Sequence, residues 1–320
     1  MAYLTLADYA ASPKPLMAGV ADVLRHASPI MDMLPFVNTG SLSVETLRQA
    51  ALPSISWRKA GESHGSGKGR VDLVKEQAYS FGNYIDVDKV YVKQDNSLYD
   101  ARALWTKQTV TSMAFEFNNQ FINGDPTAGD PDVLPGLFWR IKYDLAAAQA
   151  VDAGGIDITT AVTAANIQAM LDKLDALLYE MPEGQADALI MNRQAYLRLQ
   201  SLFRQSNALP NTTNKLGLTV PSYRGAMLID AGMKQDQASQ IIGNVELANG
   251  TALTGGTFSS IYAVRFGTEY LTGWQEYGLE VDDLGLLNDC VTYRTIVDWV
   301  IGLGITHPRS VARLYDIKAV

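Results

Sequence analysis

The sequence predicts a mixed α+β fold built from unusually long elements, and three observations carry this prediction. Apolar residues recur at helical spacing over about 98–122, which predicts a helix of roughly 37 Å at 1.5 Å per residue. Apolar and polar residues alternate over 290–301, which predicts a strand of roughly 40 Å. A glycine-rich stretch, 61–70, separates two alternating segments and predicts a long two-stranded ribbon with a mobile tip.

The composition is that of an ordinary globular protein and excludes several classes. Of 320 residues, 47% are hydrophobic and 19% are charged, which excludes a collagen-like or low-complexity chain and allows two domains. The net charge of −8 opposes general binding to DNA phosphates, although a local basic patch stays open. The lone Cys290 excludes an internal disulfide. Neither a signal peptide nor an apolar run of ~18 residues is visible, so we expect a soluble protein of intracellular origin.

The first fifty residues alternate prolines with short apolar segments. The prolines at 13, 15, 29 and 35 remove backbone donors, so we expect neither a long helix nor a central strand here. A frayed tail is one interpretation. Residues 30–37 are too apolar for a solvated tail, so we favour an arm that docks against another body, such as a neighbouring subunit.

The ribbon is predicted from period-two alternation on both sides of its tip. The pattern covers 55–57, resumes at 71–73 and continues over 79–92, with a change of phase at Asp88-Lys89 that indicates a bulge. Because a two-stranded ribbon is at best marginally stable in water, it is expected to rest on another surface.

The long helix has signals at both ends. Ser97 and Asp100 resemble a capping box, and Gly124-Asp125-Pro126 ends the pattern. Its apolar stripe includes Trp105, Phe117 and Phe121.

The rest of the chain predicts shorter elements that end in the long strand. We expect helices at 164–180 and 193–203 and strands at 188–191, 226–229, 239–245, 259–266 and 311–315, the last at a sheet edge. The long strand includes Tyr293 and Trp299, with Cys290 as a small core side chain, and Gly302-Leu303-Gly304 is expected to break it.

The motifs that would indicate catalysis or cofactor binding are incomplete. A phosphate-binding loop ending at Gly67-Lys68 needs glycine at 62 and Ser or Thr at 69, where the chain has Glu62 and Gly69. The histidines, His26, His64 and His307, lie in remote segments without the close ligand pair of a zinc site. The acidic loop with Asp125, Asp130 and Asp132 lacks calcium-loop spacing and is typical of turns. We therefore expect no catalytic, cofactor-binding or metal residues.

Several stretches follow one another in an order shared with a known family. They are Phe115–Pro126 with Pro135-Gly136-Leu137, Ala186–Asn192 with Tyr196–Leu199, Tyr223–Asp230, and Val291–Ile301 with Arg309–Leu314. Together they resemble the spine helix and its loop, two segments of the axial domain, and the C-terminal strands of tailed-bacteriophage major capsid proteins with the HK97 fold. The resemblance covers residues 30–320.

The resemblance implies a division of the chain into named parts. These are an N-terminal arm (1–50), an extended E-loop ribbon (51–95), a peripheral domain (96–135 and 280–302) and an axial domain (136–279 and 303–320). Contacts between subunits are then expected from arm and ribbon at Met33, Phe36, Trp57, Arg58, Lys59, Lys68 and Arg70. The core between spine helix and long strand is expected at Trp105, Phe117, Phe121, Tyr293 and Trp299.

The resemblance also implies a function and partners. The chain would be a structural protein, not an enzyme, that assembles as pentamers and hexamers into an icosahedral shell around phage double-stranded DNA without reading its sequence. No long scaffolding segment precedes the arm, so a separate scaffolding protein is expected, together with a portal and room for a decoration protein. Assembly is expected in the host cytoplasm, with no membrane contact. An encapsulin-type cellular compartment and a soluble enzyme using His64 or the 125–132 loop are the alternatives.

Overall fold

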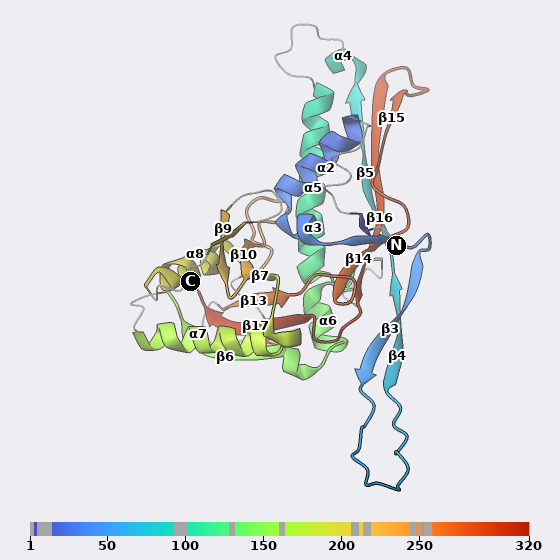
Figure 1. Cartoon of the computed structure of the whole chain (residues 1–320). Coiled ribbons are helices and arrows are strands. Elements are labelled where there is room, and N and C mark those ends of the chain that lie inside the picture. The colour runs from blue at the N-terminus through green and yellow to red at the C-terminus, as the bar shows by residue number, and fades with distance from the viewer. Residues whose placement is uncertain are drawn as a thin grey trace.

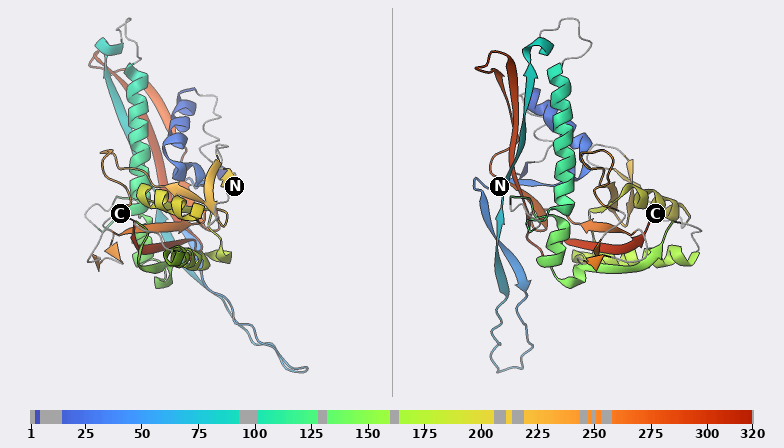
Figure 2. Two further views of the ribbon diagram at one scale, coloured as in Figure 1. Left: turned by 90° about the vertical axis from the view of Figure 1, so that its left-hand side faces the viewer. Right: turned by 180° about the vertical axis from the view of Figure 1, so that it is seen from behind.

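The computed structural model describes residues 3–4, 15–92, 101–127, 132–159, 164–205, 211–213, 219–243, 247–248, 251–252 and 258–319. A long helix lies along an elongated sheet, a second sheet forms a lobe to one side, and a two-stranded ribbon projects beyond both (Figures 1 and 2). The predicted α+β class with elongated elements is confirmed.

The first sheet is built around the long C-terminal strand. Its order is β1-β2-β14-β16-β15, and β5 also pairs with β16. The strands are β1 (Tyr3–Leu4), β2 (Phe36–Asn38), β5 (Tyr79–Asp88), β14 (Leu271–Gln275), β15 (Glu280–Leu286) and β16 (Thr292–Ile305). Helix α5 (Ala101–Asn123) packs against β5, and its apolar side chains share one core with those of the sheet. The helix matches the predicted 98–122, but Ser97 and Asp100 lie outside the described residues.

The second sheet forms the lobe and has its own core. Its order is β6-β17-β13-β7-β10-β9-β8. The strands are β6 (Ala150–Asp157), β7 (Ala188–Met191), β8 (Asn211–Thr213), β9 (Thr219–Tyr223), β10 (Ala226–Asp230), β13 (Ser259–Val264) and β17 (Val311–Lys318). Helices α7 (Ala164–Tyr179) and α8 (Arg193–Gln205) pack against it. The helices predicted at 164–180 and 193–203 and the strands at 188–191, 226–229 and 259–266 are confirmed.

Two predicted strands of the lobe need correction. Strand β17 is not an edge strand, because it lies between β6 and β13 and its first four residues are buried. The prediction of a strand over 239–245 is wrong for 239–243, where Gln240 makes only an isolated bridge to Met233. Ile241 and Ile242 are nevertheless buried, so a loop delivers these apolar side chains to the core without strand pairing.

Glycines extend β16 where they were expected to break it. The strand continues through Gly302-Leu303-Gly304 to Ile305. A Cβ on Gly302 would lie 2.5 Å from the Gln77 carbonyl oxygen, and one on Gly304 would collide with the Trp274 indole. Glycine at these positions therefore permits close approach of neighbouring segments.

The N-terminal arm folds onto its own body, which corrects two expectations. Helices α2 (Pro15–Ala27) and α3 (Pro29–Met33) each begin at a proline, which is tolerated in the first helical turn. Helix α2 packs on α5, so a helix of 13 residues does form here. Met33 and Phe36 are buried in this subunit's core, with the Phe36 ring 4.8 Å from that of Trp299, so they do not face a neighbour.

The ribbon is shorter than predicted and begins earlier. Strands β3 (Ser43–Ala51) and β4 (Arg70–Gln77) pair with each other, whereas 55–57 lies outside both strands. The alternation over 79–88 belongs to β5, which pairs with β16 and is therefore not a ribbon strand. Residues 89–92 form a helical turn, α4 (Lys89–Val92), in place of the predicted bulge. Alternation identifies a strand but not its partner, because pairing depends on distant residues.

The remaining described elements are short. They are α6 (Leu137–Tyr143), the 3-10 turns Ala147–Gln149 and Pro182–Gly184, and the pair β11 (Leu247–Ala248) with β12 (Thr251–Ala252). Cys290 is exposed in a turn before β16 with φ of 57°, which corrects its expected place inside the core.

Candidate functional site

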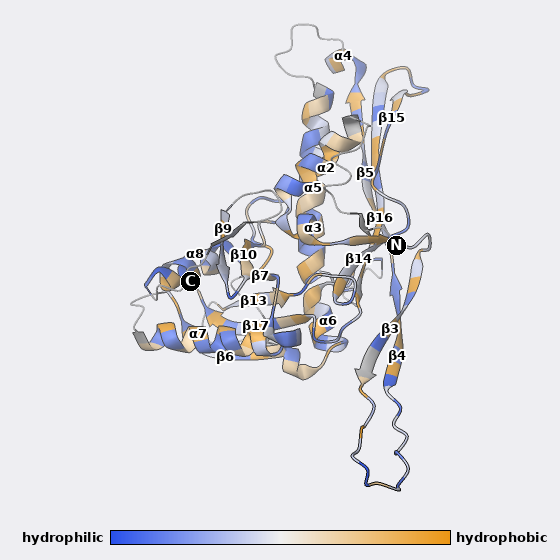
Figure 3. Ribbon diagram, in the orientation of Figure 1, coloured by the Kyte–Doolittle hydropathy of each residue, from blue (hydrophilic) through white to orange (hydrophobic). Residues whose placement is uncertain are grey.

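The ribbon turns two charged side chains toward the body and three large apolar side chains outward. Arg48 and Glu76 are buried against the body. On the opposite face Leu47 is 66% exposed and Leu73, its direct cross-strand partner, is 62% exposed, with Val71 beside them. Figure 3 shows apolar residues along the ribbon strands outside the body. This arrangement inverts the usual placement of apolar side chains and leaves an apolar strip uncovered.

Beyond the strip, the ribbon tip combines large apolar side chains with positive charge. Ile55 and Trp57 are almost fully exposed. Residues 52–70 contain four cations and one anion, Glu62. Within the tip, Arg58 donates to His64 Nε2 at 2.9 Å and to the Glu62 carbonyl at 2.9 Å. The tip is therefore an exposed surface with both apolar and basic character.

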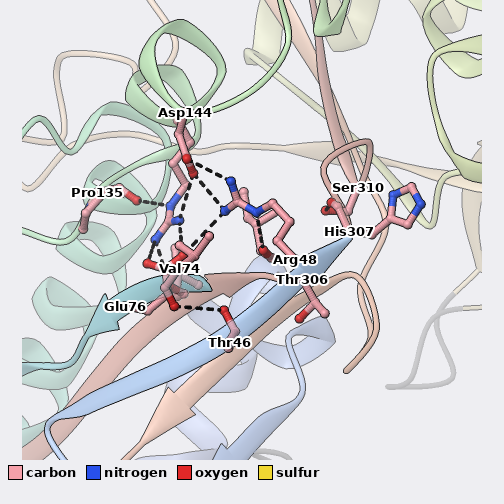
Figure 4. Close-up of polar contacts among 12 residues, drawn as sticks. Thr46, Arg48, Val74, Glu76, Pro135, Asp144, Thr306, His307 and Ser310 are labelled. Carbon is pink, nitrogen blue, oxygen red and sulfur yellow. Dashed lines mark hydrogen bonds and ion pairs between the residues drawn. The ribbon is translucent and has the colours of Figure 1, made fainter. Parts of the chain in front are cut away.

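A buried ionic cluster ties the ribbon to the body at its root (Figure 4). The Arg48 guanidinium donates to both Asp144 carboxylate oxygens, at 2.9 and 3.0 Å. The Arg140 guanidinium donates to both oxygens of Glu76, at 2.8 and 2.9 Å. Burial alone would lower the pKa of Arg140, but the charge and hydrogen bonds of Glu76 raise it, so the guanidinium stays charged. Such two-pronged pairs are strong and directional.

The far end of the first sheet carries the opposite charge. Residues 280–291 contain four acidic residues and no basic ones. Three apolar side chains there, Leu284, Leu286 and Val291, are also exposed. A hydrogen bond from the Thr292 hydroxyl and backbone bonds lower the pKa of Asp289, which keeps it ionised. This end is therefore complementary to the ribbon tip in charge and shares its apolar character.

The structure gathers five of the predicted contact residues on the ribbon. Trp57, Arg58, Lys59 and Lys68 lie in the exposed tip, and Arg70 pairs with Asp72 at 2.9 Å at the start of β4. Sequence reasoning missed Leu47, Arg48 and Glu76. Leu47 and Arg48 lie within 1–50, which the resemblance assigns to the arm, whereas Glu76 ends the alternating segment that follows the tip.

The predicted core residues divide into two groups. Phe117, Phe121 and Trp299 are buried, and the Trp299 indole donates to Gln275 Oε1 at 2.9 Å. Trp105 and Tyr293 are only partly buried. All of these residues lie on α5 or β16. They pack the helix against the sheet and do not belong to the ribbon.

The part of the chain that the structure describes holds no group of three or more His, Cys, Asp or Glu side chains placed to bind a metal ion. The Asp125 carboxylate accepts bonds from Thr127, as in a turn, and Asp130 lies outside the described residues. None of the described helices is long and apolar enough to cross a membrane.

Comparisons with known proteins give a family match and a shared fold. The model of the family described as Major capsid protein GP7 matches residues 12–230. The capsid of a native GTA particle has a TM-score of 0.59 at 15% identity, covering 92% of this chain and 90% of that chain. The SrpI encapsulin of Synechococcus elongatus scores 0.61 at 14% identity with the same coverage. Microbacterium phage Oxtober96 scores 0.56 at 12%, covering 91% and 90%.

No curated protein is similar enough in sequence to match the chain. The structural similarities, all below 25% identity, show a shared fold, and the family match spans more than half of the residues. The chain belongs to the Major capsid protein GP7 family and is a structural major capsid protein of the bacteriophage type with the HK97 fold.

Proposed function

We propose that copies of this chain assemble as pentamers and hexamers into a closed icosahedral shell that encloses double-stranded DNA in a virion. Assembly takes place in the host cytoplasm, guided by a separate scaffolding protein, with a portal at one vertex and an outer surface open to a decoration protein. The observation that carries this proposal is the ribbon, whose apolar face points away from its own body.

The ribbon needs a partner for a physical reason. A two-stranded ribbon is marginally stable alone, and a contiguous exposed apolar strip marks an interaction surface. If the ribbon of each copy lies on the next copy, the contact is heterologous and can close into a ring. Many such contacts in one shell then act together, so each one can be weak.

The acidic end at 280–291 is the surface on the neighbour that best fits the tip. The tip carries Arg58 and Lys59 beside Trp57, whereas the acidic end carries Asp282 beside Leu284. Opposite charges steer association and fix register, and apolar burial supplies the affinity.

The overall negative charge suits a DNA container. A lining that held phosphates strongly would oppose movement of the DNA during packaging and release. A net charge of −8 avoids a general attraction, so the shell encloses DNA without gripping it.

The assembly test is electron microscopy of the full chain, expressed with and without the candidate scaffold. Wild type should form pentamers, hexamers or shells, whereas deletion of 61–70 should leave folded subunits that do not assemble. Absence of these forms in wild type under both conditions would overturn the proposal. Unfolding of the deletion variant would show that the tip belongs to the subunit core.

The charge match is tested with a compensating pair. Lys59→Glu should weaken assembly, and adding Asp282→Lys should restore it. Failure of the second change to rescue the first would place the docking surface elsewhere. Nuclease-protected double-stranded DNA inside shells purified from the native host supports the virion, whereas a protein cargo without DNA would favour the encapsulin alternative.

A further inference from the structure

The ribbon is joined to the body by a cluster of four charged side chains from three separate places, of which Asp144 is partly exposed and the others are buried. Arg48 lies on β3 and Glu76 on β4, whereas Arg140 lies on α6 and Asp144 at its C-terminal cap. Figure 4 shows Arg48, Glu76 and Asp144 pointing toward one another, and Arg140 bonds to Glu76. Each strand of the ribbon therefore has its own ionic link to the body.

The cluster is held in one orientation by backbone carbonyls as well as by its ion pairs. Arg48 Nε donates to the Ile305 carbonyl at 3.1 Å, and Arg140 Nη2 donates to that of Leu303 at 2.8 Å. Arg140 Nε also reaches the Pro135 carbonyl at 3.0 Å. Because a guanidinium is planar with donors in a rigid fork, these bonds define an angle as well as a distance. These bonds fix the position of the cluster relative to the end of β16 and to the loop before α6.

The largest apolar side chains of the ribbon strands do not pack on the body. Leu47, Val71 and Leu73 are exposed on the outer face, whereas Val44 and Val74 are only partly buried on the inner face. The connections to the body are short: residues 39–42, with Gly40 at φ of 62°, join β2 to β3, and Ala78 alone separates β4 from β5. A backbone bond from Ala78 N to the Leu42 carbonyl, 2.8 Å long, ties the two connections to each other, and the side-chain ion pairs link the ribbon to α6.

We propose that the Arg48–Asp144 and Arg140–Glu76 pairs fix the direction of the ribbon relative to the body and thereby the angle between neighbouring subunits. The first half concerns the single subunit. The second half rests on the proposed shell function, since it assumes that the ribbon lies on a neighbour. These four residues position the contact and do not form it.

The first half is tested by single-molecule energy transfer in unassembled full-length subunits. Dyes are placed at Ser63→Cys on the tip and Ala176→Cys on α7, in a Cys290→Ser background. Arg48→Gln and Asp144→Asn break the same link from opposite sides. Arg70→Gln is the matched control, because it makes the same change in an ion pair within the ribbon that is 75% exposed at Arg70. Near-ultraviolet circular dichroism verifies that each variant is folded.

The expected result is a single narrow transfer distribution in wild type and Arg70→Gln, and a distribution at least twofold broader in both root variants. A broad wild-type distribution, or unchanged width in the folded root variants, would overturn the proposal. Because this readout needs no shells, its failure is distinct from failure of the proposed function.

The second half is tested by the diameters of shells assembled from the same variants without dyes. Arg48→Gln and Asp144→Asn should give a wider range of diameters or open sheets. Arg224→Gln, which removes an exposed pair with Asp175 in the lobe, should give wild-type diameters. Unchanged diameters despite a swinging ribbon would refute the link from ribbon direction to subunit angle.

Discussion

The body and the ribbon bury different kinds of side chain. In the body, Val297 and Trp299 of β16 point into the core shared with α5. In the ribbon, the polar face with Arg48 and Glu76 is buried, and the apolar face with Leu47 is exposed. The body therefore completes its own core, whereas the ribbon leaves Leu47, Val71 and Leu73 exposed in the single subunit. One subunit thus combines a body that buries its large apolar side chains with a ribbon that does not bury its own.

The largest expected effect lies in the body. Phe117→Ala should lower the free energy of unfolding by ~3–5 kcal/mol, because the ring is 2% exposed and packs 5.9 Å from Phe121. Urea denaturation of the unassembled subunit measures this. Phe115→Ala on the same helix is the control, since Phe115 is only partly buried and should cost clearly less. Equal losses would mean that this helix face is not the core.

A smaller effect is expected where the ribbon meets the body. Gly302→Ala should destabilise the subunit by ~1–3 kcal/mol, because the added Cβ would lie 2.5 Å from the Gln77 carbonyl oxygen and force the segments apart. Gly19→Ala on α2 should instead stabilise by ~0.4–1 kcal/mol, since its Cβ meets nothing within 4 Å in a helix. An unchanged free energy of unfolding in Gly302→Ala would show that β16 and the segment at Gln77 can move apart without cost.

Two carboxylates, one at the ribbon root and one in the lobe, differ in their partners. Glu76 at the ribbon root has a guanidinium partner, whereas burial raises the pKa of Asp230 in the lobe. A raised folded pKa means that stability falls as pH rises above the unfolded value of about 3.9. Asp230→Asn should therefore stabilise the subunit at pH 7, on the order of 0.5 kcal/mol, with no gain at pH 3. Thermal melts at both pH values measure this.

An exposed carboxylate in the loop after β10, Asp236, has a pKa shifted in the opposite direction. Hydrogen bonds from Ser239 and Ala238 lower the pKa of Asp236 to about 2. Its contribution is present above the unfolded value and is lost as pH falls toward 2. Asp236→Asn should therefore lower the melting temperature at pH 7. The same sign for both variants would contradict the assigned environments.

The smallest effect on subunit stability is expected on the outward face of the ribbon. Leu47→Ser should change the free energy of unfolding by less than about 0.5 kcal/mol, because the side chain is 66% exposed. It should nevertheless abolish or strongly slow shell assembly, measured by light scattering. Leu197→Ser, on an exposed side chain of α8, should leave assembly intact. Normal assembly of the Leu47→Ser subunit would show that the exposed apolar strip of the ribbon is not part of the interface between subunits.

Local patterns predicted most elements, and their errors share one cause. The long helix, the lobe helices and most lobe strands follow from periodicity alone. The partner of β5, the central place of β17 and the seating of Gly302 depend on contacts between residues far apart in the chain. The candidate site divides in the same way. The tip was visible as a charged glycine-rich segment, whereas the root cluster joins positions 48, 76, 140 and 144.

By itself, the sequence determined the fold class, the long helix and strand, and the presence of an exposed charged tip. Periodicity of apolar residues depends on neighbours a few positions away, so it can be found without coordinates. Only the tertiary structure decided that Met33 and Phe36 belong to the subunit's own core and that the ribbon buries its polar face. Alternation defines two faces of a strand, but which face is covered depends on the segment that folds against it.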